Sequence, residues 1–263
     1  MTHKPPLLFL HGAFAGPEVW TRFIVPWFAG RGHRVFAPRL PGPVFCEPRL
    51  RDYVRRARIA AESFGEKPVV IGHSLGGFIA QHLAAEGAVS GAVLVGSPGP
   101  FGLGPTLMQL AAAPDVLAAL MLVQSGGGAM LGREIVRRAL FTDDTPDEWI
   151  DAVDLVPQRE PVVALLDGIT WDLPIWPFAR RVPTLAITGE RDVFVPVSDL
   201  WSISTVYNAE IEIVPGRGHG LPLDPDWKGL AQRIETWLDQ RTYNGKAVPF
   251  PPPEAMNGTA ISL

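Results

Sequence analysis

Cysteine is almost absent from this chain of 263 residues, and so is any excess of positive charge. Cys46 is the only cysteine, so no disulfide can form within the chain and no cysteine cluster can hold a metal. The formal net charge is −4, from 23 Lys and Arg against 27 Asp and Glu, which leaves no basic surplus to neutralise phosphates. We therefore expect no nucleic-acid partner, and the single cysteine is compatible with a reducing, cytoplasmic location.

A hydrophobic run long enough to cross a membrane is also missing. The uncharged and mostly apolar stretch 116–132 is interrupted by Gln124, Ser125 and three glycines. It falls short of the ~20 apolar residues that a spanning helix needs. The apolar run before His11 is too short for the core of a signal peptide, and we expect it to be a buried strand. No membrane span is predicted, and the sequence specifies no oligomeric state.

Short apolar runs alternate along the chain with segments of helical periodicity. Six runs, each ended by glycine, proline or a polar turn, have the length and β-branched content of strands buried on both faces. They lie at 6–12, 33–40, 68–74, 91–99, 183–192 and 209–216. Apolar positions repeat with helical spacing at 20–27, 49–64 and 226–240. This alternation predicts an α/β fold in which helices flank a mainly parallel central sheet.

The alternation breaks between the fourth and fifth predicted strands. Residues 107–123 and 133–140 have helical patterns, and no strand is apparent in this stretch. A compact domain rarely holds so long a structureless loop, so we expect a helical cap insertion at 101–182. It would divide a core made of residues 1–100 and 183–241. The tail at 242–263 is rich in proline, which excludes a helix or a central strand there.

The stretch IGHSLGG places Ser74 between a predicted strand and a predicted helix. A serine at such a sharp turn sits in strained backbone geometry, and the residues two places away must be small so that strand and helix can approach. Ser74 would then lie at the carboxyl end of a central strand and at a helix N-terminus. The helix dipole and free N–H groups favour developing negative charge there.

A reactive serine needs a general base within hydrogen-bond reach, and this is usually a histidine. His219, in the loop after the last predicted strand, is the best placed. The other histidines are less well placed. His82 lies too far along the same helix, and strand alternation points His73 away. His3 and His33 precede strands at the opposite end of the sheet, and His11 shapes the adjacent loop.

An acid should orient the imidazole of His219 and stabilise its charged form. Asp192 follows the apolar part TLAITG of the fifth predicted run, at the same edge of the sheet as Ser74. Glu190 could play this part. Its earlier position in the turn favours a structural role, for instance as a partner of Arg191 or Arg217. We therefore predict Asp192 as the orienting acid.

Four motifs resemble those of the α/β-hydrolase superfamily, in its serine esterase-like branch. They are LFLHGAFAG, GHSLGG, TGERDVFVP and GRGHG, and the resemblance extends from Leu7 to Gln240. It implies an α/β-hydrolase fold, a Ser74–Asp192–His219 triad and no cofactor or metal. The oxyanion-binding N–H groups would belong to Leu75, which follows the nucleophile, and to Ala13. Phe14 would replace Ala13 if the loop were shifted by one residue.

The resemblance implies a serine hydrolase that cleaves carboxylic esters. The insertion lacks lysine between 101 and 180 and is dominated by apolar residues, so we expect an uncharged, small to medium hydrophobic substrate. Candidate pocket residues are Phe14, Phe101, Leu103, Met121, Trp171 and Trp176.

Other functions within this superfamily are separated by particular residues. Epoxide hydrolases and dehalogenases would have an aspartate in place of Ser74, and hydroxynitrile lyases depend on a lysine in the cap. Thioesterase, lactonase, carbon–carbon bond hydrolase and perhydrolase activities use the same triad and stay open. A non-catalytic receptor for a hydrophobic ligand is a further alternative, against which an intact triad weighs.

Overall fold

A six-stranded sheet forms the centre of the computed structural model, which describes residues 4–41, 47–153, 155, 157–174 and 182–241. The strands are β1 (Leu7–Leu10), β2 (Val35–Phe36), β3 (Val69–His73), β4 (Gly91–Val95), β5 (Thr184–Gly189) and β6 (Glu210–Val214). Their order is β2-β1-β3-β4-β5-β6, and each neighbouring pair is parallel. The predicted α/β class and parallel sheet are confirmed. Cys46 and the tail at 242–263 lie outside the described residues.

The strands read as continuous apolar runs because both faces of the sheet are covered. Successive side chains of a strand point to opposite faces. In β1, Leu7 and Phe9 belong to one core cluster, whereas Leu8 and Leu10 belong to the other. All residues of β3, β4 and β5 are buried in the same way. Two separate hydrophobic cores therefore hold the sheet between layers of helices.

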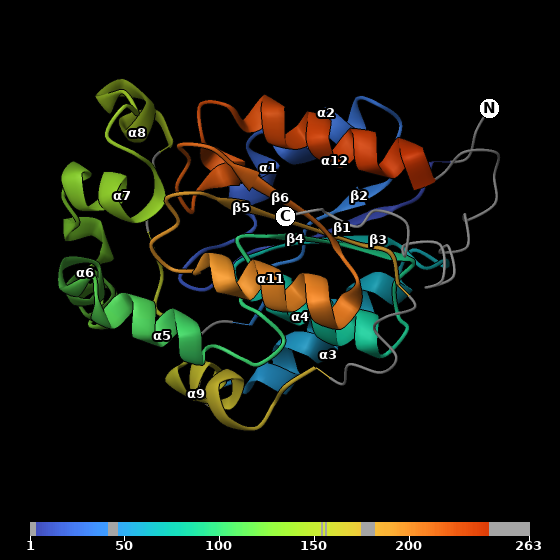
Figure 1. Cartoon of the computed structure of the whole chain (residues 1–263), viewed down its shortest axis with the longest axis horizontal. Coiled ribbons are helices and arrows are strands. Elements are labelled where there is room, and N and C mark those ends of the chain that lie inside the picture. The colour runs from blue at the N-terminus through green and yellow to red at the C-terminus, as the bar shows by residue number, and fades with distance from the viewer. Residues whose placement is uncertain (1–3, 42–46, 154, 156, 175–181, 242–263) are drawn as a thin grey trace, which may run out of the picture.

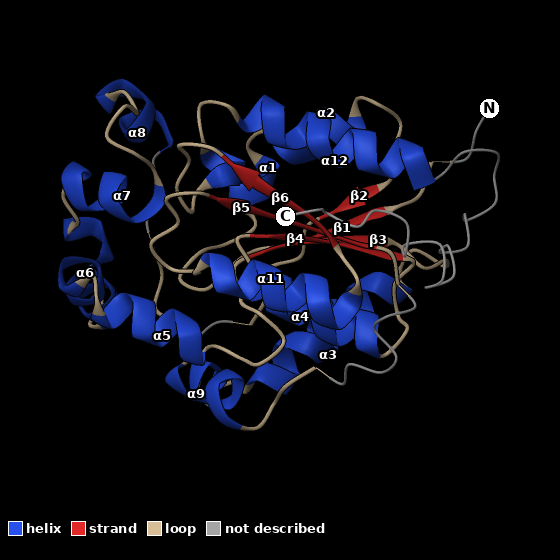
Figure 2. Cartoon of the chain, in the orientation of Figure 1, coloured by secondary structure: helices blue, strands red, loops and turns tan. Residues whose placement is uncertain are grey.

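Helices cover each face of the sheet (Figures 1 and 2). One layer consists of α1 (Glu18–Thr21), α2 (Ile24–Ala29) and α12 (Trp227–Arg241), which contribute Trp20, Phe28 and Trp237 to their core. The other layer consists of α3 (Leu50–Glu62), α4 (Leu75–Ala85) and α11 (Val197–Tyr207). A short 3-10 turn, η2 (Leu221–Leu223), precedes α12.

Prolines explain two differences from the predicted elements. The strand expected at 33–40 contracts to Val35–Phe36, since Pro38 cannot donate a ladder hydrogen bond. The single helix expected at 20–27 is divided into α1 and α2. Proline disrupts the interior of a helix but is tolerated in its first turn. Because α2 begins at Ile24, Pro26 lies in the first turn of a new helix and not in the interior of a longer one.

A helical insertion lies between β4 and β5, as predicted. Its helices are α5 (Gly104–Ala111), α6 (Pro114–Gln124), η1 (Gly128–Met130), α7 (Arg133–Leu140), α8 (Asp147–Val153) and α9 (Val162–Thr170). In Figure 1, α5, α6, α7 and α8 lie beyond one end of the sheet and α9 lies beside α3; we call these helices together the cap. The single helix expected at 107–123 is broken at Pro114, which starts α6 after a bend of 112°.

Within the described ranges, no single helix is both long and apolar enough to cross a bilayer. The α5–α6 pair has the length and composition only when its two bent halves are counted together.

Candidate active site

Ser74 lies in a sharp turn between β3 and α4, with φ 54° and ψ −123°. A positive φ is rare for a residue with a Cβ atom and persists only where the surroundings enforce it. One restraint is the hydrogen bond from Ser74 N–H to the carbonyl oxygen of Val95, at 2.9 Å. The strained turn presents the serine beyond the carboxyl end of a central strand.

The glycines on either side of Ser74 permit this turn. A Cβ atom on Gly72 would lie 2.2 Å from the carbonyl oxygen of Gly76. A Cβ atom on Gly76 would lie 2.3 Å from the carbonyl oxygen of Leu10. Both contacts are with backbone atoms, which cannot move without displacing a strand or helix. The spacing of the glycines therefore follows from the close approach of α4 to β3 and β1.

The structure brings Asp192 and His219 together in direct contact. Asp192 follows β5, His219 follows β6, and the distance from Asp192 Oδ2 to His219 Nδ1 is 2.8 Å. The other oxygen, Oδ1, accepts hydrogen bonds from the backbone N–H groups of Phe194 (2.8 Å) and Val195 (2.9 Å). With a carboxylate at Oδ2, the proton of the neutral imidazole belongs on Nδ1, which leaves Nε2 able to accept one.

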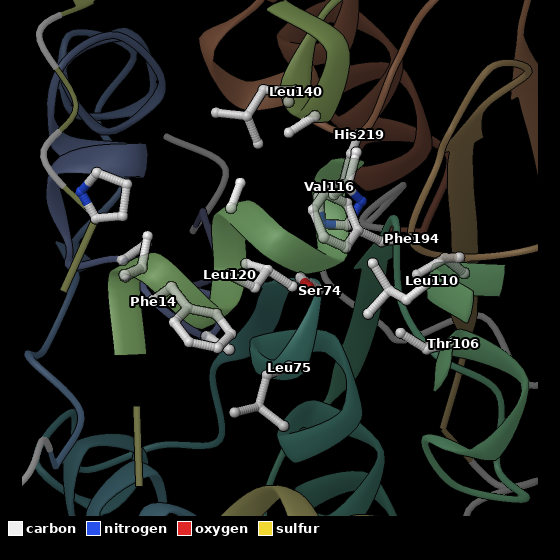
Figure 3. A pocket seen from close by; sticks show the side chains of 18 of the residues that line it. Phe14, Ser74, Leu75, Thr106, Leu110, Val116, Leu120, Leu140, Phe194 and His219 are labelled. Carbon is white, nitrogen blue, oxygen red and sulfur yellow. The ribbon is translucent and has the colours of Figure 1, made fainter. Parts of the chain in front are cut away.

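Ser74 and His219 line the same pocket (Figure 3). Among the hydrogen bonds of the described residues, none joins Ser74 Oγ to His219 Nε2. The contact between nucleophile and base is often longer in a free enzyme and shortens when substrate binds. The arrangement therefore has the three predicted side chains at one edge of the sheet, with the Asp192–His219 contact already made.

His73 contacts the candidate base from the side. Its Nε2–H donates to the carbonyl oxygen of His219 at 2.9 Å, and the two ring centroids are 4.6 Å apart. Burial, together with the nearby His219, lowers the pKa of His73 to about 3. His73 is therefore neutral at physiological pH and adds no positive charge beside His219. The prediction that strand alternation points His73 away from the site is therefore wrong, because His73 lines the same pocket as Ser74 and His219.

Two backbone N–H groups next to Ser74 are free to bind an anion. Within the described part of the chain, neither Ala13 N–H nor Leu75 N–H has an acceptor. The carbonyl oxygen of Gly12 accepts a hydrogen bond from His11 Nδ1 at 2.9 Å, and His11 Nε2 accepts one from Leu40 N–H at 3.0 Å. His11 thus shapes this loop, as predicted.

Phe14 cannot replace Ala13 as an oxyanion donor in this conformation. Its N–H already donates to Glu160 Oε2 at 2.8 Å. The possibility of a loop shifted by one residue is therefore wrong, because a side chain from the cap occupies that donor. Sequence reasoning had given Glu160 no role, and a lone glutamate in an insertion carries no signal that would have revealed one.

The pocket beside Ser74 is a cavity of about 470 Å³ beneath the cap (Figure 3). Its wall is built from the cap helices α5, α6, α7 and α9 and from the loops that carry Ala13, Phe194 and His219. No Asp, Glu, Lys or Arg is among the described residues that line it. Such a cavity fits an uncharged, apolar group.

The predicted pocket residues divide into three groups. Phe14, Leu103 and Met121 line the cavity. Phe101 and Trp171 do not, and this part of the prediction is wrong: they flank α5 and α9 and are 53% and 79% exposed. Trp176 lies outside the described residues.

A periodic signal would have identified more of the wall than aromatic character did. The α5 helix and its N-cap line the cavity with residues 103, 106, 107 and 110, which follow the spacing i, i+3, i+4, i+7 of one helix face. The α6 helix lines it with a wider surface, made of residues 116, 117, 119, 120, 121, 123 and 124.

Neither the alternative acid nor a metal site has support in the structure. Glu190 Oε2 accepts a hydrogen bond from Gly216 N–H at 2.8 Å, so its role is structural, with a backbone partner in place of the suggested arginines. Among the described residues, no three His, Cys, Asp or Glu side chains are grouped so that they could hold a metal ion.

Comparison with known protein families matches residues 7–233 to the Alpha/beta hydrolase family. The chain belongs to this family. No curated protein matches the sequence. Solved structures show the same fold at low identity, so this α/β hydrolase shares an architecture with them, and its substrate does not follow from theirs.

Three of these structures illustrate the range. A carboxylesterase from the thaumarchaeon Nitrososphaera gargenis is 16% identical, with a TM-score of 0.71 over 91% of this chain and 93% of that chain. A thermophilic esterase from Thermogutta terrifontis is 18% identical, with a TM-score of 0.69 over 91% of each chain. A 2-hydroxy-6-oxo-6-phenylhexa-2,4-dienoate hydrolase from Rhodococcus sp. strain RHA1 is 20% identical, with a TM-score of 0.63 over 89% of this chain and 90% of that chain.

Proposed function

We propose that this α/β hydrolase is a serine esterase that cleaves carboxylic esters of small to medium hydrophobic groups. The observation that supports it most is the 2.8 Å contact between Asp192 and His219, because His219 lines the same uncharged cavity as Ser74. A base oriented by a buried carboxylate is what a serine hydroxyl needs to become nucleophilic.

The proposed reaction has two halves. Ser74 Oγ attacks the ester carbonyl while His219 Nε2 takes its proton, and the oxygen that becomes negative is bound by the N–H groups of Ala13 and Leu75. His219 then returns the proton to the departing alcohol, which leaves an ester between Ser74 and the acyl group. Water, deprotonated by His219, then attacks this acyl-enzyme, the bond between the acyl carbon and Ser74 Oγ breaks, and His219 returns the proton to Oγ as the acid leaves.

The chemistry of the cavity supports an uncharged substrate. The Rhodococcus neighbour acts, by its name, on a dienoate, which carries a carboxylate. A cavity whose described wall has no Arg or Lys offers that charge no partner, and burying an unpaired charge is costly. Neutral esters therefore fit this pocket better than carboxylated carbon–carbon bond substrates do.

A fluorophosphonate probe and a panel of nitrophenyl esters test this function together. The wild-type protein should be labelled at Ser74 at neutral pH and should hydrolyse neutral esters of short to medium acyl chains. Both Ser74→Ala and His219→Ala should lose labelling and reduce kcat by about 10⁴-fold or more. Full esterase activity in Ser74→Ala would refute the assignment, and a rate maximum at a charged or very long acyl group would refute the substrate class.

A further inference from the structure

The loop that carries the proposed oxyanion donor Ala13 is held by the cap as well as by the core. Phe14, the next residue, has φ 59°, a conformation that a bulky side chain rarely adopts. Its N–H donates to Glu160 Oε2 at 2.8 Å, and its carbonyl oxygen accepts a hydrogen bond from Gln158 N–H at 2.8 Å. Both polar groups of this strained residue are therefore bound to one segment of the cap.

Glu160 is itself fixed from two directions. It is 5% exposed, and its second carboxylate oxygen accepts a hydrogen bond from the hydroxyl of Tyr53, a buried residue of α3 in the core. The side chain of Gln124 in α6 binds both backbone groups of Glu160: Nε2 donates to its carbonyl oxygen at 2.6 Å, and Oε1 accepts from its N–H at 3.1 Å. Glu160 thus joins two parts of the cap, the core and the oxyanion loop.

The orientation of Ala13 N–H depends on the peptides on either side of it. In a planar trans peptide the C=O and the N–H point in opposite directions. The carbonyl oxygen of Gly12 faces His11 Nδ1, so the N–H of Ala13 points the other way. On the far side of Ala13, the next peptide is fixed by the bond from Phe14 N–H to Glu160. The rotation of the backbone at Ala13 is restrained only while both bonds persist.

We propose that Glu160 is a positioning residue, which holds Phe14 so that the N–H of Ala13 is aimed at the developing oxyanion. Glu160 does not line the pocket and does not contact the reacting atoms. It acts through the Phe14 backbone, so the cap contributes to catalysis as well as to the substrate cavity. This inference rests on the serine esterase function proposed above.

The geometry of the bond to Phe14, more than the negative charge, should decide the effect of substitutions. Glutamine keeps the length of the side chain, its amide oxygen can accept from Phe14 N–H, and its NH₂ group can donate to Tyr53. Aspartate keeps the charge but is one methylene shorter and withdraws from Phe14. Because a displacement of ~1 Å can cost ~10²-fold in rate, we expect a larger loss for Glu160→Asp than for Glu160→Gln.

Steady-state kinetics on a neutral nitrophenyl ester test the proposal in these two variants, in Glu160→Ala, and in the exposed cap control Glu134→Ala. We expect kcat to fall about 10- to 100-fold in Glu160→Asp and Glu160→Ala, with KM within about twofold of the wild type. Glu160→Gln should keep kcat within about threefold, and Glu134→Ala should match the wild type. Inhibition by a trifluoromethyl ketone, which forms a tetrahedral oxyanion on serine, should weaken in step with kcat.

Several results would overturn the proposal. One is a kcat in Glu160→Asp within twofold of the wild type, and another is an equal loss of kcat in Glu160→Asp and Glu160→Gln. A third is a higher KM at unchanged kcat in Glu160→Asp or Glu160→Ala. If Glu160→Ala fails to fold, the Asp and Gln pair still decides the question. Loss of activity in Ser74→Ala with normal kcat in Glu160→Asp would refute the positioning role alone, whereas an active Ser74→Ala would refute the esterase assignment itself.

Discussion

The two carboxylate oxygens of Asp192 have different hydrogen-bond partners, and two substitutions can distinguish the roles of these oxygens. Oδ2 contacts His219 Nδ1, whereas Oδ1 accepts the backbone N–H groups of Phe194 and Val195. In Asp192→Asn, the amide oxygen must face those two N–H donors, because the NH₂ group would be donor against donor there. The NH₂ group then faces His219 and donates to Nδ1. The imidazole proton is forced onto Nε2, where it blocks acceptance of the Ser74 proton.

The expected magnitudes follow from this division. A wrong histidine tautomer costs ~10⁴-fold in kcat in a serine protease with the same arrangement, and we expect a loss of that order in Asp192→Asn. Its stability should change by less than ~1 kcal/mol, since the bonds to Oδ1 are kept. Asp192→Ala should be equally inactive and also less stable by about 2–4 kcal/mol, because two backbone donors lose their acceptor at about 1–2 kcal/mol each.

Kinetics at pH 7.5 and urea unfolding of both variants provide the assay. Glu190→Gln is the matched control, since Glu190 lies two residues away and bonds to Gly216 N–H; its kcat should stay within about threefold of the wild type. The reasoning is refuted if Asp192→Asn keeps more than a tenth of the wild-type kcat, or if Asp192→Ala unfolds at the same urea concentration as Asp192→Asn.

Two further predictions concern buried groups. Burial raises the pKa of Asp199 from 3.8 to about 6, and its Oδ2 has no hydrogen-bond partner among the described residues. Between those pH values the folded state keeps a proton that the unfolded state has lost, so stability falls as pH rises through this window. Asp199→Asn should therefore be more stable than the wild type by about 1–2 kcal/mol at pH 7.5, and this difference in stability should shrink towards pH 4. Thermal unfolding measures it, and a difference that does not change with pH would contradict the prediction. Gly76→Ala places a Cβ atom 2.3 Å from Leu10 O and should cost about 3 kcal/mol or more, while Gly132→Ala, with open space around its Cβ, should stay within about 0.5 kcal/mol. Equal unfolding midpoints for these two glycine variants would show that the tight approach at Gly76 is not rigid.

Local patterns in the sequence were sufficient for the architecture. Strand runs, helical spacing and the long strand-free interval predicted the parallel sheet and the inserted helices. A strand buried on both faces is a continuous apolar run, and a helix buried on one face has apolar residues at helical spacing, so both can be recognised in the sequence. The placement of Ser74, Asp192 and His219 after three strands of one parallel sheet could also be predicted, since the carboxyl ends of parallel strands meet at one edge.

Contacts between distant segments were decided by the tertiary structure. The wall of the cavity was only partly predicted, because aromatic character says little about which side of a helix faces inward: Trp171 lies at the surface while Leu103 lines the pocket. The bonds from Glu160 to Phe14 and from His73 to the His219 carbonyl join residues 146 positions apart in each case. Hydrogen bonds of this kind depend on the direction of single polar groups, which no spacing rule records. The sequence by itself therefore determined where the reactive groups would gather, and only the folded chain decided how they are aimed.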